Sequence, residues 1–254
     1  LLGVEPERRE DFKRWSDAFI GTGSSGDDDA AYHAHNGRMM EEFSAYFGAM
    51  VEARRRERRD DLISALVAAQ EDRSVLSTQD ILWFCLLLLV AGNETTTNLI
   101  SNAALALTQH PEQMALLRRD PSLIPSMIEE ALRYDSPVQG LFRVTTREVE
   151  IGGATIPADE RVLMLYASAN RDEAEFPEAD RFDITRQENN HIAFGYGVHF
   201  CLGASLARLE ARITWETLLR RTRDLRPDPD RPIVRVDNLI IRGLESFPML
   251  FEPA

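Results

Sequence analysis

Cysteine is scarce in this sequence, and the scarcity excludes one class of protein at once. Among 254 residues only Cys85 and Cys201 are cysteine. Two cysteines cannot form the disulfide framework that holds small secreted domains together. The sequence therefore predicts a protein of a reducing compartment, and we expect it in the cytoplasm.

Positive charge is also in short supply. Lysine and arginine total 29 against 42 aspartate and glutamate residues, so the formal net charge is −13. Sequence-independent binding to nucleic acid relies on a basic face, and we therefore expect no nucleic-acid partner. Apolar residues make up 44% of the chain, which argues against disorder and is enough for a real hydrophobic core.

Long hydrophobic runs are missing. The longest uninterrupted apolar run covers residues 81–91, whereas a membrane-spanning helix needs about 20 residues. No basic region followed by an apolar stretch marks a signal peptide. We expect no membrane segment in this chain and interpret 81–91 as part of a buried helix.

The spacing of apolar residues predicts a mainly α-helical chain with a smaller β portion in its second half. Helices are expected at 5–20, 30–59, 61–70, 77–109, 111–119, 125–134 and 202–223. Strands are expected at 143–146, 149–151, 162–166 and in the tail to Phe251, with a glycine-rich loop at 21–29 and an irregular segment at 173–191. The longest helix opens at a capping-box-like Ser77–Asp80 and stops before Pro111. At about 1.5 Å per residue it is close to 48 Å long, so we expect it to be the central element.

The sharpest motif is the segment 194–203, which reads FGYGVHFCLG. Gly195 and Gly197 allow backbone conformations that other residues avoid. Cys201 stands just before a helix, whose N-terminus stabilises a thiolate. A glycine-rich loop that presents a thiolate suits a metal ligand. It suits tetrahedral zinc poorly, because no second cysteine lies close by in the sequence.

These ten residues resemble the haem-binding loop of the cytochrome P450 superfamily, the haem-thiolate monooxygenases, at every fixed position of its pattern Phe-Gly-x-Gly-x-His/Arg-x-Cys-x-Gly. The resemblance implies haem b (iron protoporphyrin IX) as cofactor and Cys201 as the ligand of its iron. It implies that His199 pairs with a haem propionate. Phe194, Gly195 and Gly203 would also lie against the haem. Thiolate ligation pushes electron density onto the iron and favours O–O cleavage.

A second motif interrupts the apolar run of the long helix. Residues 91–96 read AGNETT, and glycine and threonine weaken a helix. One interpretation is that the helix ends here; against it, the apolar pattern resumes at Leu99. The segment resembles the oxygen-activation groove of the same superfamily. That implies Ala91 and Gly92 beside the haem, with Glu94 and Thr95 relaying protons to bound oxygen.

A third motif is Glu130 and Arg133, which share one face of a helix. The pair resembles the superfamily's Glu-x-x-Arg motif, and the segment 176–182 resembles the stretch that supplies a third member, Arg181. The resemblance makes these three a structural network. It also assigns a haem propionate to Arg143. It suggests further substrate contacts from Leu87, Val90, Ala91, Gln139, Ile240 and Ile241.

The resemblance covers essentially all 254 residues, but members of the superfamily are longer at the N-terminus. The sequence therefore predicts the C-terminal portion of a single cytochrome P450 domain of the soluble bacterial type, with a long central helix, a cysteine loop followed by a helix, and short β-sheets. Without the missing segments, part of the apolar surface at 81–91 is expected to face water. We expect such a fragment to be unstable or inactive alone.

The function implied is insertion of one oxygen atom from O2 into a small organic, apolar substrate. Because no flavin-binding or dinucleotide-binding site is recognised in the chain, electrons are expected from a ferredoxin or similar donor with an NAD(P)H-dependent reductase. Arg208 and Arg212 are either contacts for an acidic donor or solvated charges. The alternative function is a truncated haem-binding or inactive remnant without turnover. A Cys–His hydrolase is disfavoured, because Cys201 and His199 stand two residues apart on one tight loop.

Overall fold

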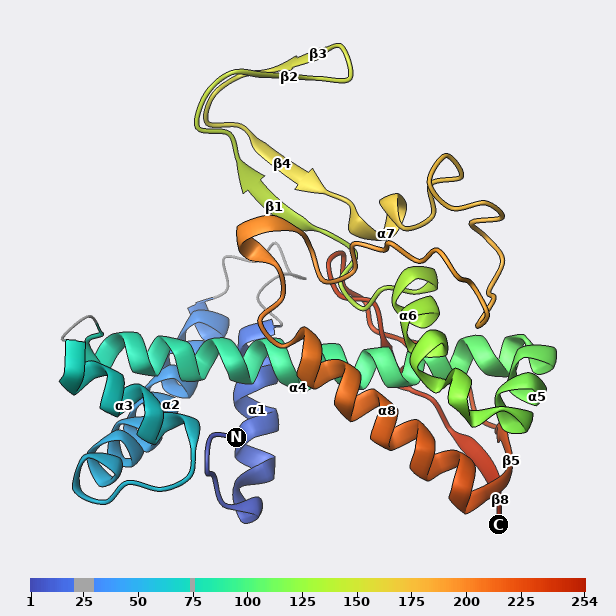
Figure 1. Cartoon of the computed structure of the whole chain (residues 1–254). Coiled ribbons are helices and arrows are strands. Elements are labelled where there is room, and N and C mark those ends of the chain that lie inside the picture. The colour runs from blue at the N-terminus through green and yellow to red at the C-terminus, as the bar shows by residue number, and fades with distance from the viewer. Residues whose placement is uncertain (21–29, 74–75) are drawn as a thin grey trace. The chain divides into compact units, whose positions relative to one another are not determined.

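The computed structural model describes residues 1–20, 30–73 and 76–254. Its backbone packing divides the chain into two compact units. We call residues 1–94 the N-terminal unit and residues 95–254 the C-terminal unit. Both are mainly helical, and the described strands form two-stranded antiparallel sheets (Figure 1). The predicted loop at 21–29 lies outside the described residues.

The N-terminal unit is built from helices that pack through aromatic rings. Its elements are η1 (Pro6–Arg8), α1 (Arg9–Ile20), α2 (Ala30–Arg56), α3 (Leu62–Arg73) and the first part of α4 (Thr78–Gln109). Trp15 on α1 meets Phe43 on α2 edge to face at 5.7 Å, and Phe43 lies 4.6 Å from Phe47. All three rings are at most 1% exposed. Aromatic burial of this extent and geometry stabilises the pairing of α1 with α2.

Helix α4 belongs to both units and has the limits that the sequence predicts. At its start the Ser77 backbone N–H donates to Asp80 Oδ2 at 2.7 Å, and the Asp80 N–H donates to Ser77 Oγ at 3.1 Å. These two bonds confirm the capping box, with aspartate as its acid. The helix continues without interruption through residues 91–96, so the interpretation of a helix end there is wrong.

One face of the first half of α4 is buried and the opposite face is not. Ile81, Cys85 and Leu89, spaced four residues apart, are at most 6% exposed. Trp83 and Leu87, in contrast, are 53% and 56% exposed. Apolar surface of the 81–91 segment therefore faces water, as expected.

The C-terminal unit adds short helices and four β-ribbons to the second half of α4. Its helical elements are α5 (Pro111–Arg119), η3 (Pro121–Leu123), α6 (Ile124–Tyr134), α7 (Tyr166–Ala169), η4 (Gly197–His199) and α8 (Ala204–Arg221). Its strands are β1 (Leu141–Val144), β2 (Val149–Ile151), β3 (Ala154–Ile156), β4 (Arg161–Met164), β5 (Thr222–Pro227), β6 (Val234–Arg235), β7 (Leu244–Ser246) and β8 (Met249–Pro253).

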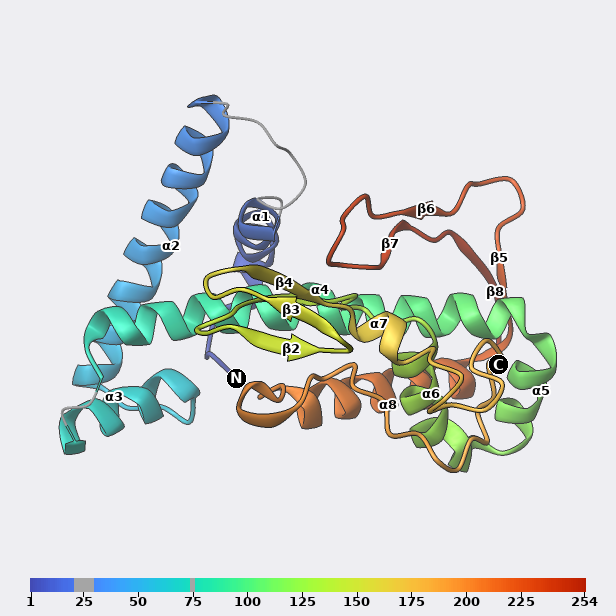
Figure 2. The same cartoon turned by 90° about the horizontal axis from the view of Figure 1, so that it is seen from above.

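The ribbons are nested along the chain. Strand β1 pairs with β4, and the β2–β3 hairpin lies at the far end of that ribbon (Figure 1). Likewise β5 pairs with β8, and β6 pairs with β7 (Figure 2). The second hairpin ends the chain and includes the turn that carries Ile240 and Ile241. Each inner hairpin thus extends an outer one.

The prediction of a mainly helical fold is confirmed, with differences at a few boundaries. The sequence predicted no element at β3, and it missed α7, because Tyr166 was placed in a strand. Helix α8 is two residues shorter at each end than predicted. Thr222 leaves the helix for β5, where its backbone pairs with Pro253. Pairing between segments distant in sequence outweighed the local helical pattern there.

A buried ion pair organises the region between α6 and the cysteine loop. Arg133 and Glu130 are both 0% exposed, with Nε and Nη2 of Arg133 each 2.9 Å from a Glu130 oxygen. The remaining N–H groups of Arg133 donate to the carbonyl oxygens of Asn170, Ala179 and Arg181 at 2.7–3.0 Å. The irregular segment 170–181 is therefore held by one guanidinium, whose five donors all have acceptors.

The third side chain of this network is that of Arg186. Its Nε lies 3.2 Å from Glu130 Oε2 and its side chain is 11% exposed. Arg181, which the sequence placed there, contributes its carbonyl oxygen, while its side chain is 55% exposed and pairs with Glu178. The Asp183 backbone N–H and the Asn189 side chain also donate to Glu130. Sequence reasoning missed Arg186 because no motif spacing marks it.

We expect Arg133→Ala to lower the free energy of unfolding by about 3–5 kcal/mol, because it leaves the Glu130 carboxylate buried without its main partner. Urea unfolding of the purified chain measures this change. Arg181→Ala is the matched control and should cost less than about 1 kcal/mol, because its ion pair is exposed. Equal losses in the two variants would contradict this description of the network.

Candidate haem-binding site

Two glycines and one backbone bond shape the cysteine loop. Gly195 and Gly197 have φ values of +73° and +72°, in the left-handed region that other residues avoid. The Cys201 N–H donates to the Phe194 carbonyl oxygen at 2.9 Å, which closes the loop. The Gly195 N–H donates to the Ile192 oxygen at 2.8 Å. The loop is thus held in one shape by its own backbone.

Cys201 stands three residues before α8 and is half-buried. A Cβ added at Gly203 would lie 4.0 Å from the Cys201 Sγ, an ordinary van der Waals contact, so Gly203 lies next to the sulfur. Cys85 has a different environment: it is 0% exposed, and burial raises the pKa of its thiol to about 11. Of the two cysteines, only Cys201 is accessible to a ligand.

A charged cluster lies behind the loop and was not predicted. Arg208 on α8 forms two bonds of 2.7 Å to Glu129 on α6, and its guanidinium lies 4.5 Å from the ring centroid of Phe194. His191 Nε2 lies 3.1 Å from Glu129 Oε2, and the Ala193 N–H donates to His191 Nδ1 at 3.2 Å. The proton of a neutral His191 therefore belongs on Nε2.

The cluster changes one expectation and adds one observation. His191 lies at the end of the predicted irregular segment 173–191, and its side chain is only 3% exposed. Arg208 was considered as a contact for an electron donor, but its charge is already paired with Glu129. Its pKa is raised, first by the hydrogen bonds to Glu129 and to a smaller degree by the charges of Glu129 and Cys201. Arg212 is half exposed and lies 3.8 Å from Glu216.

The donor set around Cys201 fits a haem. A porphyrin iron needs one protein ligand, and Cys201 offers a soft sulfur donor. The loop exposes apolar side chains suited to a flat apolar ring, with Val198 98% and Leu202 76% exposed. His199 in the loop is exposed, and Arg143 on β1 is half-buried. The C-terminal unit therefore also supplies two basic side chains that suit the propionate carboxylates of a haem. No group of three or more His, Cys, Asp or Glu side chains suited to a metal ion occurs in the described part of the chain.

The residues predicted for oxygen activation lie at mid-length on α4. Ala91 and Gly92 are exposed, and Glu94 and Thr95 are half-buried. The pKa of Glu94 is raised, chiefly by burial and further by the negative charge of Asp17 on α1, while Lys13 opposes the shift. A carboxyl with a raised pKa holds its proton at higher pH than usual, which suits a group that delivers protons.

The candidate substrate contacts fall into two groups. Leu87 and Val90 lie on α4, where Leu87 is 56% exposed. In the C-terminal unit Gln139, Ile240 and Ile241 are brought together: the Gln139 N–H donates to the Ile240 oxygen at 2.7 Å, and Val138 bridges to Ile241. The structure therefore places Gln139 next to Ile240 and Ile241, which lie about 100 residues later in the sequence.

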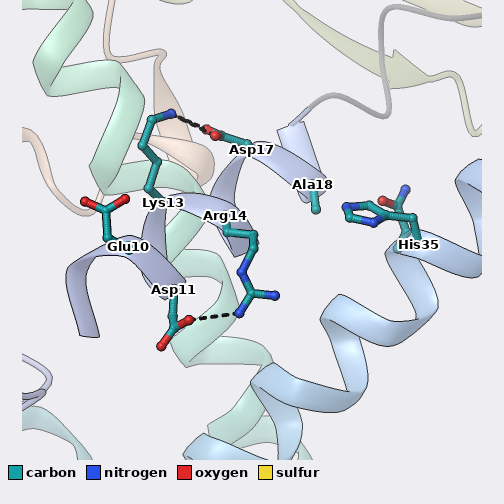
Figure 3. Close-up of a pocket in the computed structure, with 8 residues that line it drawn as sticks. Glu10, Asp11, Lys13, Arg14, Asp17, Ala18 and His35 are labelled. Carbon is teal, nitrogen blue, oxygen red and sulfur yellow. Dashed lines mark hydrogen bonds and ion pairs between the residues drawn. The ribbon is translucent and has the colours of Figure 1, made fainter. Parts of the chain in front are cut away.

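A depression of about 610 Å³ lies elsewhere, between α1 and α2 (Figure 3). It is lined by Glu10, Asp11, Lys13, Arg14, Asp17, Ala18, His35 and Asn36. Its charges are largely paired with one another: Lys13 with Asp17 at 2.7 Å, and Arg14 with Asp11 and Glu42 at 2.8 Å. It contains none of the predicted site residues.

The chain belongs to the cytochrome P450 family, whose model matches residues 31–241. It is 45% identical over 249 residues to a putative cytochrome P450, YjiB, of Bacillus subtilis, covering 97% of this chain and 62% of that protein. It is 43% identical over 257 residues to a vitamin D(3) 25-hydroxylase of Pseudonocardia autotrophica, covering 100% of this chain and 62% of the relative.

The fold is shared as well. The structure of cytochrome P450 CYP109Q5 from Chondromyces apiculatus matches with a TM-score of 0.89 and 49% identity, covering 100% of this chain and 62% of that one. This chain thus spans about three fifths of the length of the proteins it matches. None of its described helices is both long enough and apolar enough to cross a bilayer.

The Glu129 cluster predicts a pH dependence. Burial alone would raise the pKa of Glu129, but hydrogen bonds from Arg208 and His191 outweigh it and lower the pKa from 4.5 to about 2. A lowered pKa stabilises the fold above pH 4.5, and that stability is lost as pH falls toward 2. The stability advantage of the native chain over Glu129→Gln should shrink by at most about 1 kcal/mol at pH 4 and about 2 kcal/mol at pH 3.

Urea midpoints measured between pH 7 and pH 3 check this expectation. Glu173→Gln, at an exposed position, serves as the control and should track the native chain throughout. A gap between native chain and Glu129→Gln that stays constant across this range would show that Glu129 is not held ionised by the cluster.

Proposed function

We propose that this chain carries the haem-thiolate site of a monooxygenase that inserts one oxygen atom from O2 into a small organic substrate. The observation that supports this most is the cysteine loop, in which two left-handed glycines and the Cys201–Phe194 backbone bond present an accessible thiol among exposed apolar side chains. Membership of the cytochrome P450 family supports haem as the cofactor, and we propose haem b.

In this proposal Cys201 binds the haem iron as thiolate, and the N-terminus of α8 favours its negative charge. His199 and Arg143 bind the two propionates. Phe194 packs beside the ring, Gly195 sets the shape of the loop, and Gly203 lies against the haem next to the sulfur. The haem, once bound, supplies the activation of O2. Residues 1–254 would then form the C-terminal portion of a single cytochrome P450 domain.

Glu94 and Thr95 supply protons in this proposal. Burial raises the pKa of the Glu94 carboxyl, which favours its protonated form, and the neighbouring Thr95 hydroxyl would pass the proton on. Ala91 and Gly92 lack bulky side chains, which leaves α4 open to a flat cofactor and to a small ligand. The pair of acid and alcohol favours a reaction driven by electrons and O2 over one that consumes peroxide.

The substrate proposed is apolar, because its candidate contacts Leu87, Val90, Ile240 and Ile241 are aliphatic. The vitamin D(3) hydroxylase to which the chain is similar acts, by its name, on a molecule of this kind. Gln139 would add one polar contact. Electrons would come from a ferredoxin or similar protein with an NAD(P)H-dependent reductase, in the cytoplasm. Residues 21–26 have the spacing Gly-x-Gly-x-x-Gly, but they follow helix α1 rather than a strand, so they do not support a dinucleotide site.

The absorption spectrum of the haem-supplied chain, reduced and exposed to CO, tests the proposal. We expect the red-shifted Soret band of a thiolate-bound haem in the native chain and its loss in Cys201→Ala. Cys85→Ala is the matched control: it removes a thiol that is fully buried, so the Soret position should not move.

A Soret band insensitive to Cys201→Ala would refute the ligand assignment. Haem uptake with a thiolate spectrum, but no product when a reductase and ferredoxin are supplied, would favour the alternative of a haem-binding remnant without turnover. Failure to bind haem at all would favour an inactive remnant.

We expect Glu94→Gln to lower turnover by about 10²-fold or more, because an amide cannot deliver a proton at this position. The haem spectrum should stay that of the native chain. Substrate-dependent O2 consumption and its solvent deuterium isotope effect measure the change. Glu57→Gln, exposed and in the same unit, should leave the rate as it is. An unchanged rate in Glu94→Gln would remove Glu94 from the proton path.

A further inference from the structure

The C-terminal turn, residues 238–243, is tied by backbone bonds to residues 137–139. The Arg242 N–H donates to the Pro137 oxygen at 2.8 Å, and the Gln139 N–H donates to the Ile240 oxygen at 2.7 Å. Between these bonds Val138 and Ile241 form an antiparallel bridge. The three candidate substrate contacts of this unit are therefore joined by backbone pairing.

Asp135 connects these two segments through its side chain. Its carboxylate accepts a hydrogen bond from Nε of Arg242 at one oxygen, and the other oxygen lies 3.6 Å from Nη1 of Arg235. The Asp135 side chain is 13% exposed, whereas those of Arg242 and Arg235 are 42% and 38% exposed. A carboxylate so nearly buried is held by its charged partners, and in turn it holds the turn that carries them.

Helix α4 fixes the same place from the inside. Asn102, 1% exposed, donates through Nδ2 to the carbonyl oxygens of Asp135 at 3.1 Å and Arg242 at 3.0 Å. One side-chain amide thus bridges both segments. Gly243 is buried against α4, where an added Cβ would lie only 2.0 Å from Asn98 Oδ1. The turn has no room to move toward the helix, so any freedom it gains is directed away from it.

We propose that Asp135, together with Arg242 and Asn102, is a positioning cluster that sets the distance of the Ile240–Ile241 turn from α4 and thereby the size of substrate accepted. The inference rests on the proposed function, because it requires that Gln139, Ile240 and Ile241 contact the substrate. The cluster itself touches no substrate. In Asp135→Asn, Asn102 and the backbone bonds still attach the turn to α4 and to residues 137–139. The ion pair with Arg242, however, no longer opposes movement of the turn away from α4.

The first test titrates the haem-loaded chain with imidazole, 4-phenylimidazole and the larger biphenyl homologue, followed by the haem absorption shift. In Asp135→Asn we expect imidazole to bind within about twofold of the native chain, and the ratio of affinities of the two aryl azoles to shrink by about fivefold or more. If the Ile240–Ile241 turn can move away from α4, it no longer excludes the larger ligand. Asp180→Asn is the matched control, because its side chain is 89% exposed and pairs only with Arg171 among the described ion pairs.

Three results would overturn the inference. An unchanged azole ratio in Asp135→Asn would show that the cluster does not select for size. An equal fall in affinity for all three azoles would indicate a general loss of structure instead. Absence of haem uptake by the native chain would defeat the proposed function and this inference with it, whereas haem uptake with an unchanged ratio would defeat the inference alone.

Amide hydrogen exchange provides a second readout that does not depend on haem. In Asp135→Asn the Gln139 and Arg242 amides should exchange about tenfold faster or more than in the native chain, while amides of α6 stay protected. Arg242→Lys keeps the positive charge without the Nε donor and should give a smaller change of the same sign. Unchanged exchange at both amides in Asp135→Asn would show that Asp135 does not hold the turn.

Discussion

A buried guanidinium needs a hydrogen-bond acceptor for each of its N–H groups. Arg133 finds several of them in backbone carbonyl oxygens that are distant in the sequence. Two donors bind Glu130 on the same helix, and three bind carbonyl oxygens of the segment 170–181. That segment has almost no regular secondary structure, so its backbone groups lack the partners that a helix or sheet provides. One buried charge pair replaces those partners, and the chain that leads to the cysteine loop depends on it.

The cysteine loop is likewise irregular backbone that specific hydrogen bonds hold in place. Its shape comes from backbone bonds and from glycines that tolerate positive φ, while the charged cluster of Glu129, Arg208 and His191 supports it through Phe194. The Glu129 cluster carries its charges on α6 and α8, while the exposed side chains on either side of Cys201 at 198 and 202 are apolar. The loop therefore offers one sulfur to a ligand, with His199 as a basic group two residues away. This division of roles suits a large flat cofactor with a single protein ligand.

Most of the fold was predictable because local signals agreed with one another. The capping box at Ser77, the stop at Pro111 and the long apolar run together defined α4 almost to the residue. Within the segment 81–91, interpreted from the sequence as part of a buried helix, Cys85 is fully buried. One of the misses lies where a distant segment determines the structure. The strand that begins at Thr222 forms because residues 249–253 pair with it. The helical pattern of the residues before Thr222 does not predict this pairing.

The sequence by itself determined the family, the mainly helical fold and the choice of Cys201 over Cys85, because these depend on residue type and on spacing along one short stretch. Only the tertiary structure decided which charges are neutralised. Arg186 replaces Arg181 beside Glu130, Arg208 is paired with Glu129, and Asp135 binds Arg242 from more than 100 residues away. The sequence specifies the charge of a side chain. Its partner depends on which segments the fold brings close to it, because a hydrogen bond forms only at a donor–acceptor distance of about 3 Å.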